Sequence, residues 1–282
     1  MSFNLVLNSS NNVGSNANTF AYNFIGGNFK VDENMEICLA QATIPYSFYN
    51  ITTSQTVTIN WTIGVTVNTY TWTVVAGFYT VSDLNLALQL FCVTNGLYLV
   101  NGSSNVYYLS LYTNTALYKN QLIAELVPTA LPSGYTQPSG FVGYPTVTVT
   151  PQIVLSSSSA QINSILGFAT GTFPSVNTAS ISVLSTIVPI GSAVNSLLMT
   201  CNLVSNQVAM PSNILSGIPI ETTFGSNINF APAYQQWVKI TPGRYSTMTL
   251  QITDQDYTPI TALDPNVLIV LNIRKGSEKS EK

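Results

Sequence analysis

Apolar and polar residues alternate with a period of two along much of this chain. Residues 55–63 read Gln-Thr-Val-Thr-Ile-Asn-Trp-Thr-Ile, so Val57, Ile59, Trp61 and Ile63 share one face. Threonine and asparagine occupy the other face. Successive side chains of a strand point to opposite sides, so this pattern predicts a strand with one buried face.

A second strand is expected after a turn at Gly64, with a change of phase inside it. The valines at 65 and 67 lie on odd positions, whereas Tyr70, Trp72 and Val74 lie on even ones. We expect a β-bulge near Asn68-Thr69, because a bulge adds one residue to one strand of a pair.

The same alternation recurs further along the chain. It is seen at Tyr107/Leu109/Leu111, Val147/Val149, Leu197/Met199/Cys201/Leu203 and Met248/Leu250/Ile252. Clusters of glycine, proline, asparagine and serine separate these runs. Many short strands with turns between them and few helices predict an all-β chain, folded as an antiparallel β-sandwich or barrel.

Two helices are expected within this β pattern. Ser82 can cap a helix from about Asp83 to Thr94, which Asn95-Gly96 would end. A shorter helix is predicted over 160–166, ended by Gly167. Such pieces in an all-β domain cover a barrel end or fill a long connection.

Changes in amino-acid composition along the chain suggest a division into segments. Residues 113–180 are rich in proline, glycine, tyrosine and serine, and we expect them to form a small inserted domain or a set of long loops. Residues 1–112 and 181–273 would then form the main β domain. Residues 274–282 are expected to form a charged flexible tail.

Composition limits the class of protein. Hydrophobic residues make up 46% of the chain and charged residues 7%, against a usual charged share of about 25%. No apolar run reaches the roughly 18 residues that a membrane helix requires, and the N-terminus has no secretion-signal pattern. Three widely spaced cysteines, Cys38, Cys92 and Cys201, predict free buried thiols in a protein made in a reducing compartment.

The few charges are unevenly distributed. Residues 1–273 hold only four basic side chains, Lys30, Lys119, Lys239 and Arg244, against nine acids. Such a body cannot neutralise several phosphates, so a nucleic-acid reader is excluded, and the tail would touch nucleic acid at most weakly. A surface this poor in lysine and glutamate suits permanent contact with neighbouring subunits.

Catalytic motifs are missing from the sequence. The chain has no histidine, no Cys-x-x-Cys and no phosphate-binding glycine loop, which removes the common bases, nucleophile arrangements and zinc sites. Asp254 and Asp256, with Asp264 nearby, could serve a glycosidase, which needs two carboxylates about 5 to 9.5 Å apart, or hold calcium weakly. We interpret them as turn residues ahead of Pro259. No catalytic, cofactor-binding or metal-binding residue is assigned, and the chain is not expected to be an enzyme.

The three tryptophans are expected in two different environments. Trp61 and Trp72 alternate with threonine and are expected in the core, whereas Trp237, beside Pro232-Ala233-Tyr234, is the best candidate for a surface contact.

Three segments resemble the penton (vertex) capsid proteins of the adenovirus-like lineage, especially those of virophages and Polinton-type viruses. They are Glu36–Ile51, with its Ile-Pro-Tyr-x-x-Tyr-Asn-Ile exit, Gly77–Gln89, with a Gly-x-Tyr-Thr turn before the predicted helix, and the pair Thr247–Thr253 and Val267–Ile273. Ile165-Leu-Gly-Phe168 adds to them.

The resemblance implies a single jelly roll of eight strands in two sheets, assembled as a homopentamer beside a major capsid protein at the vertices of a virion. Some relatives carry an inserted upper domain, which residues 113–180 could represent, and the family has no catalytic residues to transfer. The chain lacks Arg-Gly-Asp, so the receptor-binding loop of adenovirus pentons is not carried over. A viral fibre or lectin-like glycan-binding module is the alternative, and a glycosidase the weakest one.

Overall fold

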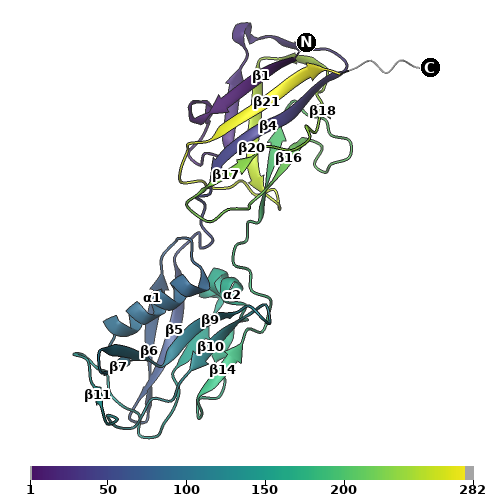
Figure 1. Ribbon diagram of the computed structural model, residues 1–282. Helices are drawn as coiled ribbons and strands as arrows, with labels where there is room; N and C mark the ends of the chain where they lie inside the picture. Colours follow the sequence, from purple (N-terminus) through teal and green to yellow (C-terminus); the bar gives the residue numbers. More distant parts are fainter. Residues whose placement is uncertain (1, 277–282) are drawn as a thin grey trace. The chain divides into compact units, whose positions relative to one another are not determined.

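The computed structural model describes residues 2–276 and divides into two compact units (Figure 1). Unit 1 combines Met1–Phe48 with Val194–Lys282, and unit 2 is the continuous segment Tyr49–Ala193. Unit 2 is therefore an insertion within the chain of unit 1.

Unit 1 consists mainly of two antiparallel sheets. Sheet 1 has the order β1 (Ser2–Asn8), β21 (Leu268–Lys275), β4 (Met35–Pro45) and β17 (Asn227–Phe230), and β18 (Val238–Lys239) also pairs with β4. Sheet 2 has the order β16 (Ile214–Pro219), β15 (Ser196–Cys201), β20 (Thr247–Asp254) and β2 (Thr19–Asn23). A small ribbon joins β3 (Phe29–Val31) to β19 (Gly243–Tyr245).

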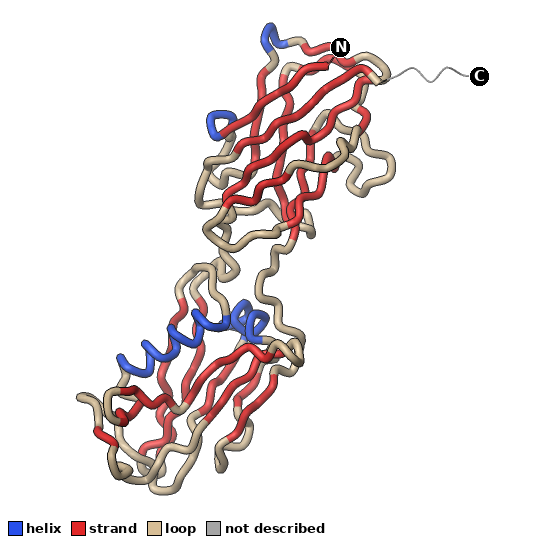
Figure 2. The backbone as a smooth tube through the Cα atoms, in the orientation of Figure 1, coloured by secondary structure: helices blue, strands red, loops and turns tan. Residues whose placement is uncertain are grey.

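The pairing of the eight main strands is nested. The first strand in sequence pairs with the last (β1 with β21), the second with the seventh (β2 with β20), the third with the sixth (β4 with β17) and the fourth with the fifth (β15 with β16). This nesting of antiparallel pairs across two sheets is the jelly roll. The predicted all-β jelly-roll sandwich is confirmed, and Figure 2 shows its dominance by strands.

The apolar side chains of the alternating segments fill the space between the two sheets. Met248, Leu250 and Ile252 of β20 are completely buried, as are Ile269, Leu271 and Ile273 of β21. Cys38, Cys92 and Cys201 are free and buried, as predicted.

Unit 2 has three smaller sheets and two helices. A four-stranded sheet has the order β13 (Gly171–Phe173), β12 (Gln152–Leu155), β5 (Gln55–Ile63) and β6 (Thr66–Val74). The others are β14 (Ile181–Leu184)–β10 (Lys119–Ala124)–β9 (Leu109–Asn114) and β11 (Tyr135–Thr136)–β7 (Tyr98–Asn101)–β8 (Ser104–Tyr107). The helices are α1 (Val81–Thr94) and α2 (Ala160–Leu166), and short 3₁₀ turns occupy Ser9–Asn11, Ile25–Gly27 and Ser157–Ser159.

Unit 2 has its own hydrophobic core. Trp61 and Trp72 are 2% and 3% exposed, which confirms their predicted place, and they pack in one cluster with Leu84 and Leu88 of α1. The indole N–H of Trp61 donates to the carbonyl oxygen of Gly143 at 3.3 Å.

Helix α1 begins earlier than expected, because its N-cap is Thr80 and not Ser82. The Thr80 hydroxyl oxygen accepts from the backbone N–H of Asp83, and the Asp83 carboxylate accepts from the backbone N–H of Thr80. The carboxylate stands three residues after Thr80, the spacing that this reciprocal capping box requires. The predicted end of the helix at Asn95 and of α2 at Gly167 is confirmed.

The predicted bulge near residue 68 is wrong. β5 and β6 pair without interruption from Gln55↔Val74 to Ile63↔Thr66. Because the turn Gly64-Val65 has two residues, each odd-numbered residue of β5 pairs with an even-numbered residue of β6. The buried face therefore holds odd-numbered residues in β5 and even-numbered residues in β6. A hairpin thus produces the phase change that we attributed to a bulge.

The units divide at different residues from those expected. Residues 49–112 and 181–193, which the sequence analysis places in the jelly roll, belong to unit 2 together with 113–180. Alternation shows that a strand has one buried face, and does not show which core buries it. Of the predicted tail, Arg274 and Lys275 belong to β21, and residues 277–282 lie outside the described part.

Candidate assembly surface

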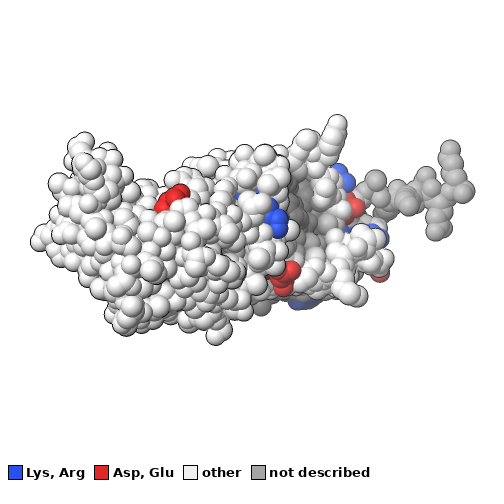
Figure 3. Space-filling model, turned by 90° about the horizontal axis from the view of Figure 1, so that it is seen from below, with Lys and Arg blue, Asp and Glu red and all other residues white. Residues whose placement is uncertain are grey.

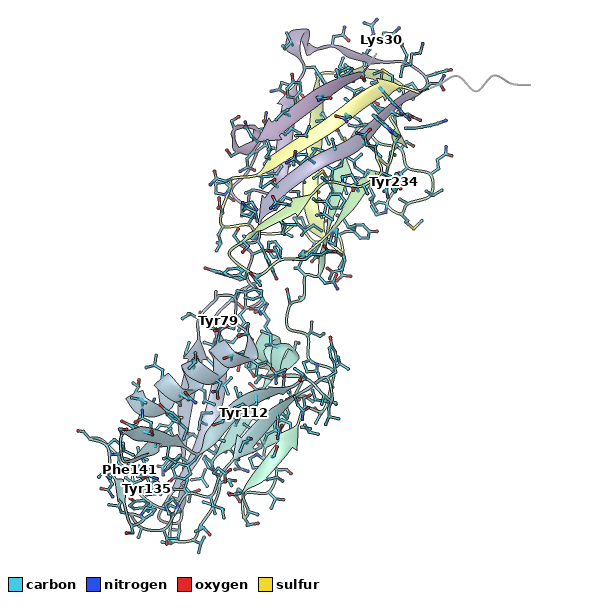
Figure 4. The ribbon with its side chains drawn as sticks, viewed as in Figure 1. Lys30, Tyr79, Tyr112, Tyr135, Phe141 and Tyr234 are labelled. Atoms are coloured by element: carbon cyan, nitrogen blue, oxygen red, sulfur yellow. The ribbon has the colours of Figure 1, made fainter. Side chains whose placement is uncertain are left out.

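Charged residues gather at one end of the jelly roll. Every basic side chain of unit 1 between residues 2 and 276 lies there, on β3, β18, β19 and the end of β21: Lys30, Lys239, Arg244, Arg274 and Lys275. Strand pairing places Lys239 and Arg274 opposite Glu36 of β4. Asp32 and Glu33 lie in the turn between β3 and β4 at the same end. Figure 4 shows Lys30 at this end.

Ion pairs tie part of this cluster together. The Arg274 guanidinium bonds the Glu36 carboxylate through Nη2 and Nε, both at 2.9 Å, and lies 3.9 Å from the centroid of the Trp237 ring. Lys30 Nζ is 2.8 Å from Asp32 Oδ1, and this hydrogen bond lowers the pKa of the Asp32 carboxyl. Among the described residues this end thus holds one local ion pair and one between distant strands, both partly exposed to solvent.

Trp237, the predicted surface contact, is partly buried beneath Arg274. The neighbouring Tyr234 is 87% exposed and protrudes from this loop (Figure 4). Tyr234 is therefore more exposed than Trp237, which lies against Arg274 of a distant strand in a cation–π contact that cannot be read from neighbouring residues.

The opposite end of the jelly roll is acidic. Asp254 ends β20, Glu221 follows β16, and Asp264 precedes β21, with Asp256 in the turn after β20. None of the described lysines or arginines of unit 1 lies at this end. Unit 2 is joined to this end by sequence, since β4 ends and β15 begins there.

The aspartates that could have been catalytic act as turn residues. Asp254 Oδ1 accepts from the backbone N–H of Asp256 at 2.9 Å and of Thr258 at 2.8 Å. Asp264 Oδ1 accepts from the backbone N–H of Asn266 at 2.9 Å. These bonds confirm the turn interpretation. Within residues 2–276 no three acidic, cysteine or histidine side chains are grouped to hold a metal ion.

The outer face of sheet 1 is uncharged between the two ends. Its three consecutive cross-strand rows hold small apolar and amide or hydroxyl side chains: Asn4 and Asn272; Val6, Val270 and Gln41; Asn8, Leu268 and Thr43. The side chain of Val6 is 51% exposed. The buried Oδ1 of Asn272 has no hydrogen-bond partner among the described residues.

The outer face of sheet 2 is also uncharged. Because Met248, Leu250 and Ile252 point inward, the residues between them on β20 point outward. Threonines dominate the resulting face, which includes Thr19, Ala21, Asn23, Leu198, Thr247, Thr249 and Gln251. Thr200 and Thr253 lie on the same side of the sheet but are only 7% and 3% exposed. The jelly roll therefore has charged ends and two neutral flanks.

Unit 2 is almost free of charge. Its only residues that are charged at neutral pH are Asp83, Lys119 and Glu125. Asp83 is used in the α1 capping box, and Lys119 Nζ donates to the carbonyl oxygen of Ser185 at 2.7 Å. The space-filling view in Figure 3 is accordingly almost uniformly white.

The exposed side of α1 carries an apolar stripe. Leu86, Leu90 and Val93 follow helical spacing and are 60%, 67% and 36% exposed, while Leu84 and Leu88 face the core. The helix is therefore apolar on both sides, which is unusual for a helix facing water alone.

A cavity of about 290 Å³ opens on unit 2 between the start of α1 and the β9–β10 turn. Val81, Ile165 and Pro189 supply apolar walls, and Tyr118 and Lys119 lie at its lining. The Tyr118 side chain is 75% exposed and its backbone has φ of 50°, a left-handed conformation that is rare for a tyrosine. Among the described residues, no helix is long and apolar enough to cross a membrane.

The neutral flanks were only partly foreseen from the sequence. The low charge signalled an assembly surface, whereas the gathering of charges at two ends was hidden, because Lys30, Lys239 and Arg274 are far apart in the chain and meet only through strand pairing.

The chain is similar to two solved virophage structures. No protein-family model and no curated protein matches the sequence. A penton protein of mavirus is 12% identical over 97% of this chain and 98% of that one, with a TM-score of 0.44. A chain of the Sputnik virophage particle is 10% identical over 96% and 97%, with a TM-score of 0.42. At these identities the likeness concerns the fold alone.

Proposed function

We propose that this chain is a structural capsid protein that forms the pentameric vertex capsomer, or penton, of an icosahedral virion. Its fold suits this role, because an eight-stranded jelly roll with an insertion between β4 and β15 is the architecture that the sequence resemblance implies. In this proposal its partners are other copies of the chain and a neighbouring major capsid protein. The chain is made in the host cytoplasm and is not an enzyme.

The observation that carries the proposal is the separation of charge in unit 1. Burying an ion at a contact requires its desolvation, which costs several kcal/mol unless a partner compensates. The two flanks between the charged ends contain no ion to desolvate, and their asparagine, threonine and valine side chains match the composition of permanent contacts, which are depleted of charge.

The two flanks also suit a closed ring. They belong to different sheets, so a contact of one flank with the other is heterologous, and such a contact forms a ring when its rotation closes. The charged ends remain free for contacts above and below. Nucleic acid would bind at most weakly through the tail, whose Lys279 and Lys282 lie outside the described residues.

The native mass of the purified protein at moderate salt tests the proposal. Native mass spectrometry or light scattering should give five times the chain mass of 30.4 kDa. A chain that stays monomeric, or that forms a trimer at every concentration tested, contradicts the penton proposal.

The alternative of a fibre or lectin-like module has one observation in its favour. The cavity on unit 2 presents an exposed tyrosine in a strained backbone conformation beside Lys119, and aromatic faces with polar neighbours suit sugar rings. Binding to a glycan array that is lost in Tyr118→Ala, together with a trimeric mass, would favour this function.

A further inference from the structure

Strand β6 of unit 2 is an open sheet edge of unusual length. It is the last strand of the β13–β12–β5–β6 sheet and runs for nine residues, Thr66–Val74, which makes it the longest edge strand of the described chain. Its sequence, Thr-Val-Asn-Thr-Tyr-Thr-Trp-Thr-Val, contains no charge and no proline, and its pairing with β5 has no bulge. β6 thus lacks the features by which monomeric proteins protect an edge.

The backbone groups that this edge offers can be identified. In a hairpin with a two-residue turn, the residues that flank the turn, here Ile63 and Thr66, form a hydrogen-bonded pair, and bonded and non-bonded pairs alternate along the strands. The N–H and C=O groups of Val67, Thr69 and Thr71, and of Thr73, therefore point away from β5.

These groups are accessible and unpaired within the subunit. All four residues are exposed, and no backbone hydrogen bond joins them to another element among residues 2–276. A row of unpaired groups of this kind is a template for a further strand.

The same unit has a second open edge, at β14. This strand, Ile181–Leu184, pairs only with β10. The bond from Ser185 N–H to the Asn120 carbonyl oxygen makes that pair a bonded one, so by alternation the backbone groups of Leu184 and Ser182 point away from β10. Ile181 and Leu184 are 42% and 40% exposed. Figure 1 shows β6 and β14 on opposite sides of unit 2.

We propose that β6 of one copy of the chain pairs with β14 of the next copy, so that the inserted units form a strand-paired seam. This inference rests on the proposed pentamer and names one of its contacts. Two different edges on opposite sides give a heterologous contact, the type that closes into a ring. Both edges are uncharged, and unit 2 holds only three charged residues, so adjacent copies meet without like-charge repulsion.

Cysteine cross-linking of the full chain tests the seam. Thr71→Cys and Ser182→Cys place one thiol on each edge, and the native cysteines are buried and should not react. With a short bismaleimide the double variant should give a covalent ladder that ends at five subunits. Each single variant is the matched control and should remain uncross-linked, because the edge that carries the thiol then faces a strand without one.

The outcomes separate the seam from the proposed function. A covalent dimer from Thr71→Cys alone would show β6 pairing with β6 and would overturn the proposal. A pentamer by native mass without any cross-link overturns the seam and leaves the penton function intact, whereas a monomer by native mass overturns the penton function itself. If the double variant does not fold, as judged by its melting curve, Thr69→Cys with Leu184→Cys gives the same test.

Discussion

A lysine on the outer face of sheet 1 should dissociate the assembly without unfolding the subunit. Val6 lies in the middle row of this face, beside Val270, and is 51% exposed. In the isolated subunit the ammonium group of Val6→Lys reaches water along the side chain, so the free energy of unfolding should change by no more than about 0.5 kcal/mol.

The cost in the assembled ring is much larger. Each contact between neighbouring jelly rolls would bury one unpaired ammonium group. Such burial typically costs several kcal/mol, and we use a value of about 3 kcal/mol. The five jelly-roll contacts of the ring form in four association steps, so the loss is about 3.8 kcal/mol per step, or roughly a 500-fold rise in the concentration at which half the chains are assembled.

The assay is a concentration series by native mass spectrometry, with a thermal melt of each protein at the same pH. Val13→Lys is the matched control, because Val13 is also a valine of unit 1 with a 51% exposed side chain and lies outside the strands. Assembly of Val6→Lys at the wild-type concentration would refute the neutral-flank reasoning, as would equal dissociation of both variants.

Three further results are expected. Trp61→Ala should lower the free energy of unfolding of unit 2 by about 3–5 kcal/mol in a urea titration, because it removes a large core side chain that is 2% exposed. Thr80→Ala should cost about 1 kcal/mol in the same titration by removing the N-cap of α1, whereas Ser82→Ala should be close to neutral. Burial raises the pKa of Cys92 to about 12 and that of Cys201 to about 11, so the unfolded chain loses these protons first. Stability should therefore fall as pH rises above the ordinary thiol value of about 8.5, in melts from pH 7 to 10.5, and this loss should shrink in Cys92→Ala.

Local structure was largely readable from the sequence. The alternation at Val57–Trp61 and at Met248–Ile252 predicted strands with the correct buried faces, and Gly167 marked the end of α2. These signals act over a few residues, because a strand has a fixed period of two and a glycine accepts the left-handed φ, here 74°, that ends a helix. The predicted position was wrong where two nearby residues could have the same role, as Thr80 and Ser82 could as the N-cap of α1.

The assignment of strands to two cores depended on the tertiary structure. Residues 49–112 alternate in the same way as the jelly-roll strands, and they belong to unit 2 because Trp61 and Trp72 are buried in the same core cluster as Leu84 and Leu88 of α1. The neutral flanks could not be predicted from the sequence either. Composition determined that charge would be scarce, but nested antiparallel pairing brought Lys30, Arg244 and Arg274 to one end, together with Asp32 and Glu36, and left the other end with acids alone. The sequence by itself determined an all-β chain with little charge, because period and composition are local properties. Tertiary structure decided where that charge lies, because strands distant in the chain must pair before their ends can meet.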